Sequence, residues 1–191
     1  MLTVKNCPVK ASDAELVELV LDNSDYFICL MERYEAKLRR YILRLGRFSA
    51  EDGDDLLQEV FIKAYKNLRG FNIEMSFSAW IYRIAHNHVI SQFRHNSARP
   101  LTVELDTNDN SLLATGLQLD GRIDQVLLAE SIKRALEKLR PAYREILTLK
   151  FLEDRSYDEL ADILQKPPGT IATLIHKAKK EFKQHWTYEQ S

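Results

Sequence analysis

The last third of the chain, from Ser156 to Phe182, carries two helical patterns that meet at the break Lys166-Pro167-Pro168-Gly169. The first pattern opens with a capping box, because Ser156 stands three residues before Glu159 and can accept a hydrogen bond from its amide. The second is expected to open at Thr170 and carries four lysines towards its end. Two short helices joined by a turn that contains glycine are typical of a helix-turn-helix, which places its second helix in a DNA groove. A helical hairpin with a solvated lysine face is the alternative.

The rest of the chain also shows the helical repeat wherever it is periodic, and no segment alternates as a strand would. An all-α fold is therefore predicted. The helices are expected to begin near Ser12, to run from Phe27 to Leu45, from about Asp54 to Leu68 and from about Ser76 to Phe93, and to resume from Val126 to Leu139 and from Pro141 to Phe151. The apolar stripes expected to face the core include Met31, Tyr65 and Phe151, as well as Leu174 and Phe182 of the last helix.

Between these two groups of helices the composition changes. Residues 97–122 are rich in Asp, Asn, Ser, Thr and Gly and carry few large apolar side chains. Such a segment is typical of a flexible linker. We therefore predict two small helical domains, 1–96 and 123–191, joined by an acidic linker over 97–122.

Composition narrows the class of protein. The 191 residues contain no apolar run near the roughly 18 residues that cross a bilayer, and the N-terminus shows no secretory signal. Cys7 and Cys29 are too few for a disulfide framework or a four-ligand metal site, so reduced thiols in a cytoplasmic protein are predicted. The net charge of −1 weighs against a free-standing nucleic-acid binder, although the charges are unevenly distributed.

Enzymatic chemistry finds little support in the motifs. The sequence has no glycine-rich phosphate loop, no HExxH pair and no nucleophile elbow. We therefore predict no catalytic residue, no cofactor, no bound metal and no small-molecule substrate. His88 falls on an apolar stripe and is expected to be a satisfied core residue. Asp54, Asp55 and Glu59 could form a metal cluster, a solvated acidic face matched to the helix dipole, or a docking surface.

The outer face of the helix near Ser76–Phe93 favours nucleic-acid binding. Opposite its core stripe it presents arginine, amide and hydroxyl groups, and the loop Phe71–Ser76 precedes it. Arginine suits phosphate, while aromatic and amide groups suit unstacked bases. The residues expected on this face are Tyr82, Arg83, His86, Asn87, Ser91 and Arg94. Aromatic residues at helical spacing, such as Phe77 and Trp80, are more often core, and that alternative stays open.

Two groups of motifs resemble one known family. DLLQEVFIKAY at 55–65, Phe71, and FSAWIYRIAHN at 77–87 resemble conserved region 2 of bacterial sigma-70 factors. LRPAYRE at 139–145, SYDELA at 156–161 and GTI at 169–171 resemble region 4. A short chain with only these two regions is similar to the extracytoplasmic-function (ECF) group.

The resemblance implies the following partners and residue roles. Asp55, Gln58 and Glu59 would dock on the β′ clamp helices of core RNA polymerase, and region 4 would also dock on the β flap. Region 2 would bind the −10 promoter strand through Phe71, Asn72, Ser76, Trp80, Arg83 and Asn87. Region 4 would bind the −35 element through Thr170, Thr173, His176, Lys177 and Lys180. The two-domain layout would permit an anti-sigma factor as a further partner.

The recognition helix departs from the family pattern. Many ECF factors carry Lys-Ser-Arg where this chain has Ala172-Thr173-Leu174, so the bidentate readout of guanine by a basic side chain is missing there. An atypical −35 preference is expected. The predicted function is thus that of an ECF sigma factor. A helix-turn-helix regulator with an N-terminal domain for sensing or dimerisation is the alternative.

Overall fold

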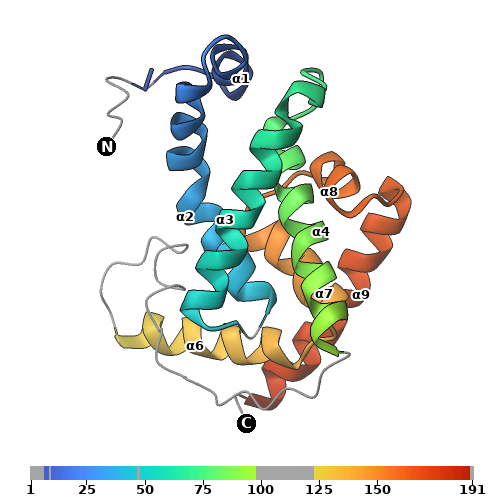
Figure 1. Cartoon of the computed structure of the whole chain (residues 1–191). Helices are drawn as coiled ribbons and strands as arrows, with labels where there is room; N and C mark the ends of the chain where they lie inside the picture. Colours follow the sequence, from blue (N-terminus) through green and yellow to red (C-terminus); the bar gives the residue numbers. More distant parts are fainter. Residues whose placement is uncertain (1–6, 9, 47, 98–122, 190–191) are drawn as a thin grey trace. The chain divides into compact units, whose positions relative to one another are not determined.

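The computed structural model describes residues 7–8, 10–46, 48–97 and 123–189, and all the regular structure in these ranges is helical (Figure 1). The all-α prediction is therefore confirmed. The elements in chain order are α1 (Asp13–Asp22), η1 (Ser24–Tyr26), α2 (Phe27–Leu45), α3 (Ala50–Asn67), η2 (Leu68–Gly70), α4 (Phe77–Ser97), α6 (Ile123–Lys138), α7 (Pro141–Leu147), η3 (Thr148–Leu152), α8 (Tyr157–Leu164) and α9 (Pro168–Glu189). Within the described ranges, no helix is both long and apolar enough to cross a membrane.

These helices fall into two compact units. The first holds α1 to α4, and the second holds α6, α7, η3, α9 and the larger part of α8. The predicted linker lies outside the described residues from 98 onwards. The exact domain boundaries, 1–96 and 123–191, stay a prediction.

Helix starts follow local capping chemistry. Ser12 and Ser156 each accept a hydrogen bond from the third residue of the following helix, and the glutamate there accepts one back, so both capping boxes are confirmed. The third helix begins at Ala50 rather than near Asp54. Its start is set by Ser49, whose Oγ accepts from the Asp52 amide at 3.0 Å.

The core of the first unit is formed where α2, α3 and α4 pack against one another (Figure 1). Three of the predicted orientations are wrong. Met31 and Tyr65 are 36% and 48% exposed, whereas Tyr82, expected on the outer face of α4, is fully buried beside Tyr41 with 5.1 Å between ring centroids. Tyr82 is buried because α4 contacts both α2 and α3 and so buries a wider face than one apolar stripe.

The second unit is built around α9, which packs against α6 and α7. The predicted start of α7 at Pro141 is confirmed. Phe151, however, is 53% exposed and not part of the core, whereas Leu149 is fully buried. The cause is the π-helical turn η3, in which the Glu153 amide donates to Thr148 O at 3.0 Å and shifts the side-chain register.

The two cysteines are paired in a Cys7–Cys29 disulfide, whereas the sequence predicted reduced thiols. They are 22 residues apart in sequence, but their Cα atoms lie 5.5 Å apart. Arg33 of α2 reinforces this arrangement by donating to Asp13 at 2.6 Å and to Ala11 O at 2.8 Å. Cys7, Ala11 and Asp13 are therefore each tied to a residue of α2.

Candidate nucleic-acid interface

A pocket of about 570 Å³ opens beside α3, η2 and α4. Its walls combine amide, hydroxyl, cationic and aromatic side chains, a mixture suited to a nucleobase and its phosphate. The lining residues are Lys63, Asn67, Gly70, Trp80, Arg83, Ile84, Asn87, His88 and Ser91.

Half of the predicted −10 residues line this pocket. Trp80, Arg83 and Asn87 are among them, whereas Phe71, Asn72 and Ser76 are not. The sequence missed Lys63 and Asn67 as site residues. They lie four residues apart on α3 and so share one face of that helix, but no local pattern links that face to α4.

Trp80 serves as a wall of the pocket rather than as a free stacking surface. Its side chain is only 7% exposed, so the alternative that it is a core residue holds as well. Its ring lies 5.1 Å from that of Phe71 and 5.5 Å from that of Phe77, measured between centroids. These aromatic contacts fix the start of the 71–76 loop against α4.

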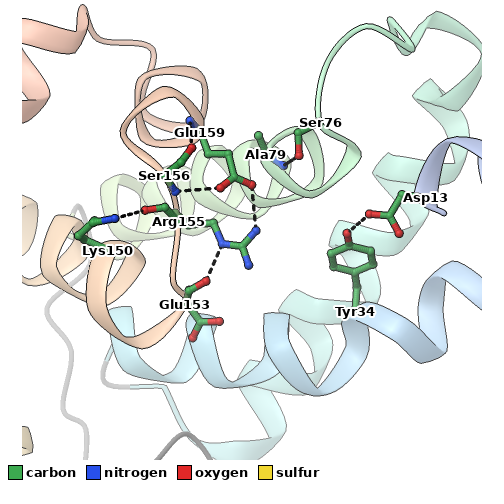
Figure 2. Close-up of polar contacts among 9 residues, drawn as sticks. All are labelled: Asp13, Tyr34, Ser76, Ala79, Lys150, Glu153, Arg155, Ser156 and Glu159. Carbon is green, nitrogen blue, oxygen red and sulfur yellow. Dashed lines mark hydrogen bonds and ion pairs between the residues drawn. The ribbon is translucent and has the colours of Figure 1, made fainter.

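The 71–76 loop is shaped by its own polar groups. Asn72 Oδ1 accepts from the Glu74 amide at 3.0 Å, and the Met75 amide donates to Asn72 O at 2.9 Å. Ser76 Oγ accepts from the Ala79 amide at 3.3 Å at the start of α4 (Figure 2). Asn72 and Ser76 are both exposed and therefore remain accessible while they hold the loop in shape.

Glu59 and two of the lining residues, Lys63 and His88, form a three-residue cluster that we call the Glu–Lys–His cluster. Lys63 Nζ contacts His88 Nδ1, and His88 Nε2 lies 3.0 Å from a Glu59 carboxylate oxygen. The second contact is close but not aligned, because Nε2 is buried and has no hydrogen-bond partner among the described residues. His88 is thus a core residue as predicted, at 6% exposure, but not a fully satisfied one.

Burial, and next the nearby Lys63 ammonium, lower the pKa of His88, and these two effects outweigh the opposite effect of Glu59. The neutral imidazole is therefore the favoured form, and its Nδ1 lone pair can accept from Lys63. The cluster thus contains one cation and one anion on either side of a neutral ring.

The predicted docking residues share one exposed face of α3. Asp55, Gln58 and Glu59 are all exposed, at the spacing that places side chains together on a helix. Ile62, one turn further along, is 46% exposed and adds an apolar side chain to this face that was not predicted. Asp54 instead pairs with Arg39 of α2 at 2.6 Å. Across the described chain, no group of three or more His, Cys, Asp or Glu residues could hold a metal ion.

The predicted −35 residues all lie on the exposed side of α9. Thr170, Thr173, His176, Lys177 and Lys180 are exposed, and the helix begins two residues before the predicted start at Thr170. Its other side holds Ile171, Ile175 and Ala178 in the core, while Leu174 and Phe182 are only half-buried. The Thr173 hydroxyl donates to Gly169 O at 2.9 Å, so part of its bonding capacity is used within the helix.

The start of α8, the helix before α9, is held by Arg155, which lies at the centre of the network of polar contacts shown in Figure 2. Its Nη1 donates to Glu159 at 3.1 Å and its Nε donates to Glu153 O at 2.7 Å. Glu159 also accepts from the Ser156 amide at 2.9 Å. The turn into α9 follows Gln165, which is left-handed at φ 51°. The predicted pair of helices joined by a turn is thus present, with the second helix starting at Pro168 instead of Thr170.

Comparisons with known proteins agree with this layout. Residues 30–99 match the family described as Sigma-70 region 2, and residues 129–182 match Sigma-70, region 4. The solved structure of CnrH in complex with the cytosolic domain of CnrY is similar in fold, with a TM-score of 0.66 and 21% identity over 90% of this chain and 95% of that one. The sigma factor RpoE of Bartonella quintana, solved in complex with the anti-sigma factor NepR, has the same TM-score and identity. The match covers 84% of this chain and 96% of that one.

Relatives with similar sequences show to which group within the sigma-70 family this chain belongs. The ECF RNA polymerase sigma factor SigW of Bacillus subtilis is 30% identical, over 83% of this chain and 87% of that protein. The ECF RNA polymerase sigma-E factor of Escherichia coli K12 is also 30% identical, over 88% and 91%. Both alignments extend beyond the helix-turn-helix, which a regulator sharing only that motif would not explain. The chain therefore belongs to the ECF group of the sigma-70 family of RNA polymerase sigma factors.

Proposed function

We propose that this sigma factor holds a promoter at two points, with the pocket beside α3 and α4 at the −10 strand and the exposed side of α9 at the −35 element. The pocket is the observation that carries the proposal. It brings an arginine, a lysine and two asparagines together with an indole wall, on the unit that does not contain the helix-turn-helix. A regulator that used only the helix-turn-helix would have no need of it.

In the first contact, the pocket receives an unstacked base of the −10 strand. Extruding a base from a duplex needs a few kcal/mol. Hydrogen bonds in the pocket and contact with its indole wall would offset this cost. Asn87 and Arg83 would contribute hydrogen bonds, and the loop residues Phe71, Asn72 and Ser76 would guide the strand to the pocket. Opening thus proceeds through binding energy, and the chain acts without catalysing a reaction.

In the second contact, α9 enters the major groove of the −35 element. Thr170, Thr173, His176, Lys177 and Lys180 would face the DNA. Since Ala172 and Leu174 cannot read guanine bidentately, recognition relies more on phosphate contacts and DNA shape. We expect a −35 preference that depends weakly on any single guanine.

Polymerase holds both contacts in place. Asp55, Gln58 and Glu59, extended by Ile62, would dock on the β′ clamp helices, and the second unit would dock on the β flap. The protein would act in the cytoplasm, with its two domains bounded as predicted and the linker between them. Because NepR is an anti-sigma factor and was solved bound to RpoE, we propose that an anti-sigma factor also binds this chain.

Run-off transcription tests the proposal. Purified core polymerase is supplied with a pool of genomic fragments, with and without the chain, and the transcripts are sequenced. New discrete start sites that appear only with the chain are expected. If the chain binds its DNA fragments alone but neither binds core polymerase nor creates start sites, the proposal fails.

A further inference from the structure

The Glu–Lys–His cluster connects two surfaces that the proposed function treats separately. Glu59 and Lys63 lie one turn apart on α3, with 4.0 Å between the carboxylate and the ammonium, and His88 of α4 contacts both. Glu59 belongs to the docking face, and Lys63 lines the pocket. One cluster therefore touches the expected sites of polymerase and of DNA.

Charge balance at the pocket depends on this cluster. Of the nine lining residues, Lys63 and Arg83 carry positive charge. The Glu59 carboxylate is close enough to Lys63 to offset one of these two charges, and a phosphate approaching Lys63 also meets this carboxylate. As long as no docked protein binds Glu59, the pocket therefore attracts a DNA strand less strongly than its two positively charged lining residues alone would.

Glu59 is also free to change partners. Its side chain is 54% exposed, whereas His88 is buried at 6%, so an incoming basic side chain reaches the carboxylate directly. A carboxylate held by an arginine of a docked protein no longer competes for Lys63. The lysine then has only the neutral His88 as a neighbour in the cluster.

We propose that Lys63 is a further DNA-binding residue of the pocket and that Glu59 masks it until polymerase docks. This inference rests on the proposed function of the pocket and of the docking face. On this proposal the free chain, whose net charge is −1, binds single-stranded DNA less strongly than the chain docked on polymerase.

The test uses the full chain without polymerase and a fluorescent single strand of random sequence about a dozen nucleotides long. Glu59→Gln should bind this strand about two- to fivefold more tightly at low salt, the range expected from an exposed ion pair. The slope of log affinity against log salt concentration should become steeper by about 0.7, because one extra phosphate contact on a single strand contributes about that much. Glu51→Gln removes the same charge from an exposed position of α3 and should give a smaller gain and no change in slope.

Lys63→Met separates the possible outcomes. If the gain in strand affinity acts through Lys63, it should disappear in a Lys63→Met background. In that background, adding Glu59→Gln should raise the affinity no more than adding Glu51→Gln. If Lys63→Met weakens binding while Glu59→Gln only equals Glu51→Gln, the masking is refuted but the pocket stands. If Lys63→Met has no effect on strand binding, Lys63 is no DNA-binding residue and the inference falls. If Asn87→Ala is equally without effect, the proposed pocket falls as well.

A second arm uses the complex with core polymerase at saturating concentration. There, wild type and Glu59→Gln should bind the same strand equally, because docking has already removed the mask. A persistent two- to fivefold difference in the complex would overturn the role of docking.

Discussion

At the scale of single residues, Asn87 offers the clearest test of the pocket. It is an exposed amide on α4 and lines the pocket beside Arg83, so truncating it should not disturb the core. We expect Asn87→Ala to reduce promoter opening by about tenfold, since a lost hydrogen bond to a base costs about 1–3 kcal/mol, while binding to core polymerase is unchanged. Permanganate footprinting measures opening, and co-elution measures polymerase binding.

The matched control is Gln92→Ala, which removes an amide from the same helix but not from the pocket. It should leave both measurements unchanged. A loss of polymerase binding in Asn87→Ala would show that the residue has a different role.

His88 makes the stability of the first unit depend on pH. Its folded-state pKa lies below the ordinary 6.5 because of burial and Lys63, so between these two values the unfolded chain binds more protons than the folded one. The free energy of unfolding should therefore fall as the pH falls from 6.5 to the lowered pKa, by up to about 1.4 kcal/mol per pH unit. Above both values this residue gives no pH dependence.

Urea unfolding at several pH values checks this prediction. The chain has two tryptophans, Trp80 and Trp186, one in each unit, so in a Trp186→Phe background the fluorescence reports the first unit alone. His88→Gln should remove this component of the pH dependence. An unchanged slope in that variant would assign the effect to other groups.

At the scale of helices, the capping box of α8 stabilises the helix-turn-helix. Ser156 Oγ accepts from the Glu159 amide at 3.1 Å, which satisfies one of the free amides at the helix start. We expect Ser156→Ala to lower the free energy of unfolding of the second unit by about 1 kcal/mol. Urea unfolding followed by Trp186 fluorescence in a Trp80→Phe background measures the free energy of unfolding of this unit. Ser131→Ala, which removes a hydroxyl within α6, should change it by less than about 0.5 kcal/mol.

The basic side of α9 should make its own contribution to promoter binding. Lys177 is exposed among the predicted −35 residues, and a lysine that neutralises one phosphate contributes about one to the salt slope. Lys177→Ala in the polymerase complex should therefore weaken promoter binding and lower that slope by about one. Lys179→Ala is the matched control, because Lys179 Nζ lies over the Phe151 ring, 4.8 Å from its centroid. Equal slopes in the two variants would place the phosphate contact elsewhere.

At the scale of the whole molecule, the Cys7–Cys29 disulfide should make only one of the two units sensitive to thiol reagents. Closing a loop of this length stabilises a fold by about 3 kcal/mol in the chain-entropy account. Cys7→Ser, or dithiothreitol on the wild type, should destabilise the first unit by about that amount, as Trp80 reports. The second unit, as Trp186 reports, should be unaffected. A shift in both units would mean that they unfold together.

Much of this architecture could be predicted from the sequence because its causes are local. The capping boxes at Ser12 and Ser156 and the start of α7 at Pro141 depend on residues within one helical turn. The helix-turn-helix and the family motifs are likewise continuous in sequence. The exposed residues of α9 follow from its buried face in the same way.

Only the tertiary structure decided what depends on neighbours distant in sequence. Tyr82 is buried because α4 meets two helices at once. Lys63 and His88, 25 residues apart, become one cluster only when α3 packs against α4. The sequence by itself determined the helices, the capped starts at Ser12 and Ser156, and the family. Packing decided which of their faces form the pocket, because side chains from different helices meet only after the chain has folded.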